Sequence, residues 1–183
     1  MKTALASFVL VSTLAAVAPA APVPRAIDPI RSSARFSVQH IWVERVTGTV
    51  AILSGSVVLG PGSAIPIRVS AVLDATRIAT DEPDRDRALE SPDFFDAKKF
   101  PTWTFSSTSI VTLGPNAFEM DGSLTIHGVT QPEQLNVTVS GDAANPSYRA
   151  KGQIDRHAFG MTKTRLDPTI GGTADITLDV TLK

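Results

Sequence analysis

From about residue 27 onward, apolar residues recur at every second position of the chain rather than at every third or fourth. They are mostly Val, Ile, Leu and Phe, and the positions between them are largely polar. This period of two is typical of strands that have one buried and one solvated face. The residues that share a parity within each segment are Phe36, Val38, His40 and Trp42; Ile65, Ile67, Val69, Ala71 and Leu73; Trp103, Phe105, Val111 and Leu113; Phe118, Met120, Leu124 and Ile126; Leu135, Val137 and Val139; Tyr148, Ala150 and Ile154; Ala174, Ile176, Leu178, Val180 and Leu182.

Turn-forming residues separate these segments. Gly, Pro, Asn and Asp cluster at 60–62, 114–116, 141–146 and 171–172, over lengths suited to hairpins. The pattern predicts an all-β fold of roughly eight antiparallel strands. Strands with one apolar face must either pack as two sheets or close into a barrel, and an eight-stranded barrel has room inside for side chains or one small ligand.

The alternation stops between Leu73 and Thr102. Pro83 followed by acidic residues predicts a short helix over 83–90, because proline and negative charge both suit the first turn. An aromatic loop over 91–101 follows. Its rings, together with the two that come next, either plug one end of a barrel or line the entrance to an apolar pocket. These rings belong to Phe94, Phe95, Phe100, Trp103 and Phe105.

The N-terminus has the pattern of an export signal. Lys2 precedes a small-residue apolar stretch, and Ala18-Pro19-Ala20 resembles a cleavage site, so residues 1–20 are predicted to be a signal peptide. The apolar run is shorter than the ~20 residues needed to cross a bilayer, so we expect no stable membrane span. Residues 21–26 contain two prolines and are predicted to form a Pro/Ala-rich tether. The folded domain is then expected over 27–183.

Composition excludes several functions. The chain has no Cys, which excludes thiol nucleophiles, zinc ribbons and Fe–S clusters. Its 17 basic and 18 acidic residues argue against binding nucleic acid, which requires a basic face. The three His have no metal-ligand spacing, and there is no G-x-S-x-G, H-E-x-x-H or phosphate-binding glycine loop. We therefore predict no metal, no cofactor and no catalytic residues.

Several blocks, in order along the chain, resemble the YceI-like family. The similarity covers nearly all of residues 27–182. One departure is Ala88, which stands where many members carry a His; if that His touches a ligand head group in relatives, the contact is lost here. The matching blocks are Ile27-Asp28-Pro29 with Ser33, Phe36, Val38 and His40; Val46-x-Gly48; Arg85-Asp86 with Leu89; Ser91-x-Asp93-Phe94-Phe95-Asp96; Phe100-Pro101 with Phe105; Leu124-x-Ile126-x-Gly128-Val129-Thr130; and Ile154-Asp155-Arg156 with Phe159-Gly160-Met161.

The resemblance implies a lipocalin-like antiparallel barrel, exported to the bacterial periplasm, that encloses a long polyisoprenoid, an isoprenoid quinone or a similar lipid for storage or transport. It leaves homodimer formation open. Together with the alternation, it selects a set of ligand-binding candidates. These are Phe36, Val38, His40, Trp42, Ile67, Val69, Phe94, Phe95, Phe100, Trp103, Phe105, Leu124, Ile126, Ile154 and Phe159.

Two other functions stay open. The first is a stress-related or structural periplasmic protein whose barrel is filled by its own side chains. Small residues on the inward parities argue for a cavity instead. The second is an enzyme acting on isoprenoid lipids, which would require His40 and an acid to face one cavity. The small residues are Ala71, Gly122, Ala150, Gly152 and Ala174.

The polar candidates have alternative roles. His40 is expected either to be hydrogen-bonded inside the barrel or to anchor a ligand head group. Arg156 would meet a phosphate or carboxylate at the mouth, or form a structural ion pair. His127 and His157 lie at predicted strand ends and are expected on the surface. The charged residues of 81–87 are predicted to form a solvated helix face.

Overall fold

The computed structural model describes residues 21–40, 44–162 and 169–183. Strands make up most of this part of the chain, with one short α-helix and one 3₁₀ helix, so the all-β prediction is confirmed. The elements are β1 (Val23–Ala26), β2 (Ser33–His40), β3 (Glu44–Leu59), β4 (Pro66–Ala79), α1 (Pro83–Glu90), β5 (Thr102–Gly114), β6 (Ala117–Ile126), β7 (Val129–Ser140), β8 (Ser147–Asp155), η1 (Arg156–Phe159) and β9 (Ile170–Thr181).

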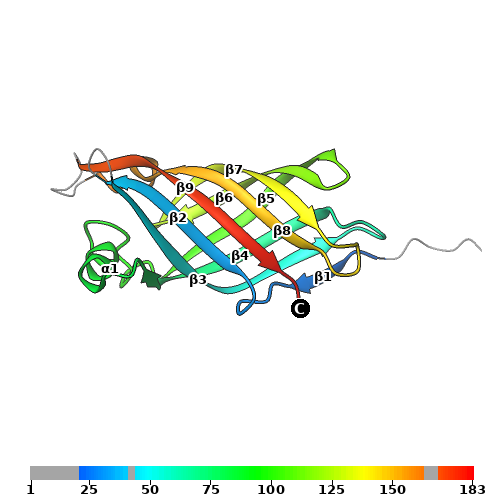
Figure 1. The fold of residues 1–183 in the computed structure, drawn as a ribbon, viewed down its shortest axis with the longest axis horizontal. Coiled ribbons are helices and arrows are strands. Elements are labelled where there is room, and N and C mark those ends of the chain that lie inside the picture. Colours follow the sequence, from blue (N-terminus) through cyan, green and yellow to red (C-terminus); the bar gives the residue numbers. More distant parts are fainter. Residues whose placement is uncertain (1–20, 41–43, 163–168) are drawn as a thin grey trace, which may run out of the picture.

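The strands close into an antiparallel barrel. Their order is β3-β2-β9-β8-β7-β6-β5-β4, and β4 pairs back with β3 to complete the circle. Figure 1 shows the strands tilted around one axis, with α1 at one end of the barrel and β1 at the other. The eight-stranded barrel is therefore confirmed, and the alternative of two packed sheets is wrong.

The prediction of a tether over 21–26 is wrong for residues 23–26, which form β1. This strand pairs with the C-terminal part of β3, from Val23 opposite Leu59 to Ala26 opposite Ser56. It continues into a bridge between Ile27 and Leu182 at the end of β9. Proline does not prevent this pairing, because a strand at a sheet edge needs few of its own N–H groups for the ladder.

Bulges shift the alternation within β3, β4 and β5. In β4, Leu59 pairs with Pro66 and Val58 with Arg68, so Ile67 is an extra residue. Pro66 is therefore buried, while Ile67 is 57% exposed. The prediction that Ile67 faces inward is wrong, because a bulge of one residue reverses the parity of the strand on one side of it.

The same correction applies to the end of β5. Pairing with β6 shifts between Ser107 and Ser109, so Thr108 is the extra residue. Ile110, opposite Met120, then packs against the core. The exposed residues are Val111 and Leu113, which the alternation had placed on the buried side.

Helix α1 is confirmed over the predicted residues and is clamped to the end of β4. The Asp86 carboxylate accepts hydrogen bonds from both the backbone N–H and the hydroxyl of Thr80, at 2.8 and 2.6 Å. Arg85 donates to the hydroxyl and carbonyl oxygens of the same Thr80, which is buried. Arg85 and Asp86 thus hold the helix in place and are not part of a solvated face as predicted.

Candidate functional site

The barrel encloses an apolar cavity of about 180 Å³. All eight strands of the closed barrel contribute to its wall, which extends from Ile27 and Tyr148 near β1 to Phe95 and Met161 near α1 (Figure 1). The charged residues along it are Arg35, Glu133 and Arg156; the others are apolar apart from the Tyr148 phenol. A space of this composition favours an apolar guest over water.

Just over half of the predicted ligand-binding residues line this cavity. They lie on β2, β4, β5, β6 and β8 and in the aromatic loop, which shows that the inward parity is right for much of the wall. These residues are Phe36, Val69, Phe95, Trp103, Phe105, Leu124, Ile126 and Ile154.

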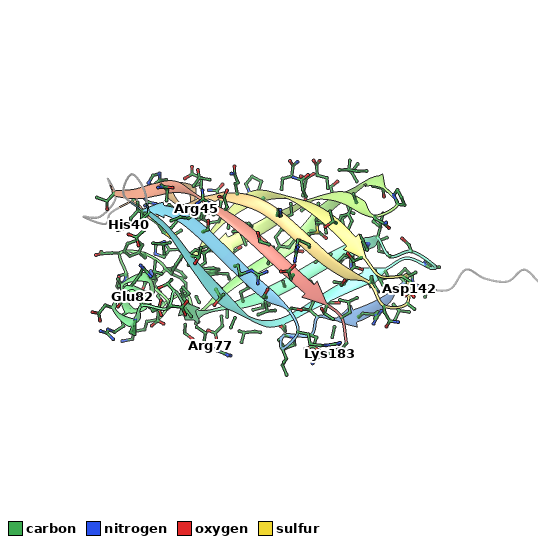
Figure 2. The ribbon with its side chains drawn as sticks, in the orientation of Figure 1. His40, Arg45, Arg77, Glu82, Asp142 and Lys183 are labelled. Carbon is green, nitrogen blue, oxygen red and sulfur yellow. The ribbon has the colours of Figure 1, made fainter. Side chains whose placement is uncertain are left out.

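The end of β2 departs from the prediction. Pairing with β9 is irregular between Val38 and His40, and neither residue is among those that line the cavity. The His40 side chain is 31% exposed, and its Nδ1 lies 3.7 Å from a carboxylate oxygen of Glu44. Figure 2 shows His40 at the rim of the barrel, so it is not the interior anchor that was considered. Trp42, the last candidate of this segment, lies outside the described residues.

The aromatic loop mainly closes the α1 end of the barrel. Phe94 is buried, and Phe100 packs edge-on against the His127 ring at 5.2 Å, but neither lines the cavity. Phe95 does reach the cavity and stacks at a tilt on Trp103, with ring centroids 4.6 Å apart. The loop therefore both plugs the barrel end and supplies a ring to the cavity wall.

Phe159 on η1 is fully buried but lies outside the cavity lining. Its carbonyl oxygen is 3.2 Å from Nδ1 of His127, which is half-buried at the β6–β7 turn. His157, on the same short helix, is exposed as expected. These residues pack η1 against the end of the barrel.

Inward glycines do not leave empty space, contrary to the expectation for Gly122 and Gly152. A Cβ on Gly122 would lie 2.3 Å from Cζ of Phe105, so the ring covers the glycine. A Cβ on Gly152 would lie 2.7 Å from Leu135 and 2.9 Å from the Glu133 carboxyl. The expected alanines, in contrast, do line the cavity: Ala71, Ala150 and Ala174.

Arg156 has a structural role at the α1 end. Its guanidinium donates to the carbonyl oxygens of Gly171, Met161 and Ile170 at 2.9, 2.6 and 3.0 Å. These bonds fasten the start of β9 to the segment after η1. Because the side chain is buried and also borders the cavity, it forms part of the cavity floor.

Glu133 is a charged cavity residue that the sequence analysis missed. It is 9% exposed, and burial raises the pKa of its carboxyl from 4.5 to about 7, against the opposing effect of a hydrogen bond from the Gln153 backbone N–H. It lies on β7 in phase with Leu135 and Val137. A carboxylate at a β7 position that shares the parity of buried apolar residues was the sequence signal that could have identified it.

Another polar atom borders the apolar interior. The indole Nε1 of Trp103 is buried without a hydrogen-bond partner among the described residues. Within the same part of the chain, no group of three or more His, Asp or Glu side chains is arranged to hold a metal ion. Nor does any helix there have the length and apolar character needed to span a membrane.

A closed antiparallel barrel with an apolar, capped interior defines a class of proteins that hold their own side chains or one small guest inside. This chain belongs to the YceI-like family, whose domain model matches residues 26–182. The resemblance seen in its sequence blocks is thereby confirmed.

Individual relatives agree with this assignment. Protein YceI of Salmonella arizonae is 29% identical over 176 residues, which cover 92% of this chain and 91% of the relative. Burkholderia cenocepacia BcnA superposes with a TM-score of 0.70 at 19% identity, covering 86% of this chain and 99% of that one. A polyisoprenoid binding domain from Saccharophagus degradans gives 0.68 at 14% identity, with coverage of 86% and 97%. The structural likenesses show that the barrel fold is shared.

Proposed function

We propose that this chain is an exported carrier that encloses the apolar chain of an isoprenoid lipid or quinone for storage or transport. The observation that carries the proposal is the capped, almost entirely apolar cavity along the barrel. The similarity to a polyisoprenoid binding domain and the predicted signal peptide support it. In this proposal the protein acts by binding and shielding its guest in the periplasm, and catalysis is not part of its role.

Energetics favour such a guest. Removing about 500 Å² of hydrocarbon from water yields on the order of 12 kcal/mol, and immobilising the chain takes back several kcal/mol. The open space of about 180 Å³ is slightly larger than an engineered cavity of about 150 Å³ that admits benzene. A long isoprenoid therefore has to displace side chains of the cavity wall, which includes the rings of Phe36 and Phe105.

Native mass spectrometry with organic extraction, on the protein purified from its own periplasm, tests the proposal. We expect one isoprenoid or quinone per barrel. An empty barrel that also fails to take up added prenyl lipid would overturn the carrier function and favour a structural barrel or an enzyme.

Variants connect the guest to the cavity. Phe105→Asp places a charge in the wall, and Ala71→Phe fills the cavity with a ring without adding charge, so both should lose the guest. Arg68→Glu changes a residue exposed on β4 and should keep it. Equal retention by all three variants would contradict binding inside the barrel, and Ala71→Phe keeps the test valid if the charged variant does not fold.

A further inference from the structure

The ladder of paired residues in the barrel wall is incomplete between β7 and β8. These strands pair from Asn136 opposite Lys151 to Ser140 opposite Ser147, and toward the α1 end the described residues of the two strands form no further ladder pairs. There, residues 129–135 of β7 still pair with β6, and residues 152–155 of β8 still pair with β9. The ladder between the two strands therefore ends here, although their backbones stay close, since a Cβ on Gly152 would lie 2.9 Å from the Gln134 carbonyl oxygen. This end of the ladder is called the β7–β8 separation below.

A surface groove lies over the separation, and Glu133 connects it to the interior. The groove is lined by β7, β8 and β9, including Gln134, Lys151 and Gln153. Glu133 and Ile176 line both the groove and the cavity. These two side chains are thus the partition between the apolar interior and a polar outer surface.

The Glu133 carboxyl is held at the separation by its neighbours. It accepts a hydrogen bond from the backbone N–H of Gln153, a group that the β7–β8 ladder leaves unpaired at this level. The residues beside it on both adjacent strands are glycines: Gly122 is opposite on β6, and a Cβ on Gly152 of β8 would lie 2.9 Å from a Glu133 carboxyl oxygen. A side chain at position 152 would occupy the space of the carboxyl oxygen.

Other charged groups nearby are already bound or lie outside. Arg156 borders the same cavity, but its guanidinium donates to three backbone carbonyls. On β9, Asp175 accepts from Gln153 Nε2 and from Arg45, each at 2.7 Å. Lys151 is exposed on β8 in the groove. Glu133 is therefore the charged side chain that a guest in the cavity meets where the wall separates.

We propose that the polar head of the guest lies at the β7–β8 separation against Glu133, and that the preferred guest is an isoprenoid with a neutral hydroxyl head rather than a phosphate. The inference rests on the function proposed above. A hydroxyl can hydrogen-bond to a carboxyl whether the carboxyl is ionised or protonated. A phosphate would bring like charge against a buried carboxylate, which is unfavourable in a site with little water.

Three probes of one chain length test this inference on the full mature protein stripped of bound lipid: farnesol, farnesyl phosphate and the hydrocarbon farnesene. Affinities are measured by tryptophan fluorescence at pH 8. We expect farnesol to bind about tenfold more tightly than farnesyl phosphate, because the phosphate is repelled by the Glu133 carboxylate. Glu133→Gln should reduce this preference, and Glu133→Leu should bind farnesol no better than farnesene. Glu119→Gln, which removes a carboxylate of β6 outside the cavity lining, should behave as the wild type.

The outcomes separate this inference from the carrier function. If farnesene binds, but wild type and Glu133→Gln treat farnesol and farnesyl phosphate alike, the assignment of the head group to Glu133 is overturned and the carrier function stands. If none of the three probes binds, both proposals fail.

Discussion

Replacing Glu133 with Gln should make the unfolding free energy of the barrel less dependent on pH. Burial raises the pKa of this carboxyl from 4.5 to about 7 in the folded protein. Between these values the native carboxyl still holds its proton while the unfolded one is ionised, so folding takes up a proton. The contribution of Glu133 to stability is therefore greatest below pH 4.5 and is lost as the pH rises through 7.

The size of the effect follows from the pKa change. Raising the pKa from 4.5 to about 7 corresponds to on the order of 3 kcal/mol. Because Glu133 also borders the surface groove, water reduces this value, and we expect about 1.5–3 kcal/mol. Gln fills the same volume and can accept the same Gln153 N–H, but it does not titrate in this range.

Urea unfolding of both proteins at pH 5, 6, 7 and 8, stripped of lipid and followed by tryptophan fluorescence, measures the difference. The wild-type unfolding free energy should fall by this amount relative to Glu133→Gln across the series. Every pH-dependent contribution that does not involve position 133 is common to both proteins and cancels in the comparison. A difference that stays constant from pH 5 to pH 8 would refute the reasoning.

Two further substitutions test the packing of the interior by urea unfolding. Phe118 is 1% exposed in the core, so Phe118→Ala should lower the unfolding free energy by about 3–5 kcal/mol, and a loss under 1 kcal/mol would contradict its placement. Gly122→Ala places a Cβ 2.3 Å from the Phe105 ring and should cost about 1–3 kcal/mol. Gly114→Ala, whose added Cβ meets nothing within 4 Å, is the control and should change stability by less than about 0.5 kcal/mol. Equal effects of the two glycine variants would argue that the Phe105 ring does not cover Gly122.

The alternation predicted β6 to β9 well, because each of these strands keeps one parity. In β6, for example, Phe118, Met120, Leu124 and Ile126 are all buried and each alternate residue is only partly so. Pairing of β6 with β7 and of β8 with β9 runs without a register shift. Where the ladder is regular, hydropathy along the chain translates directly into inside and outside.

The same reasoning failed on β3, which the alternation did not identify as a strand. Its buried residues are Val46, Val50 and Ile52 on even numbers, then Val57 and Leu59 on odd numbers. The parity changes where pairing with β4 shifts between Ile52 and Ser54. A bulge has no hydropathy signature of its own, so a segment that contains one loses its apparent period.

Part of the site could be read from the sequence and part could not. The parity of Phe105, Leu124 and Ile154 placed these residues correctly in the cavity wall. Glu133 could have been identified from its phase on β7. Its hydrogen bond from the Gln153 backbone N–H could not, because that N–H is available only where the β7–β8 ladder ends, and no local sequence pattern encodes this end.

Curvature explains where the bulges fall and what they expose. β3 spans 16 residues and would reach about 50 Å if straight, so it must bend to stay on a small barrel (Figure 1). Bulges supply that bend, and they increase local twist. Each extra residue turns apolar side chains outward. Leu53 on β3 and Ile67 on β4 are extra residues and are exposed. On β5 the extra residue is Thr108, and Val111, which follows it, is exposed. Their exposure is thus a consequence of closing the barrel, so it does not by itself mark a surface for a second copy of the chain.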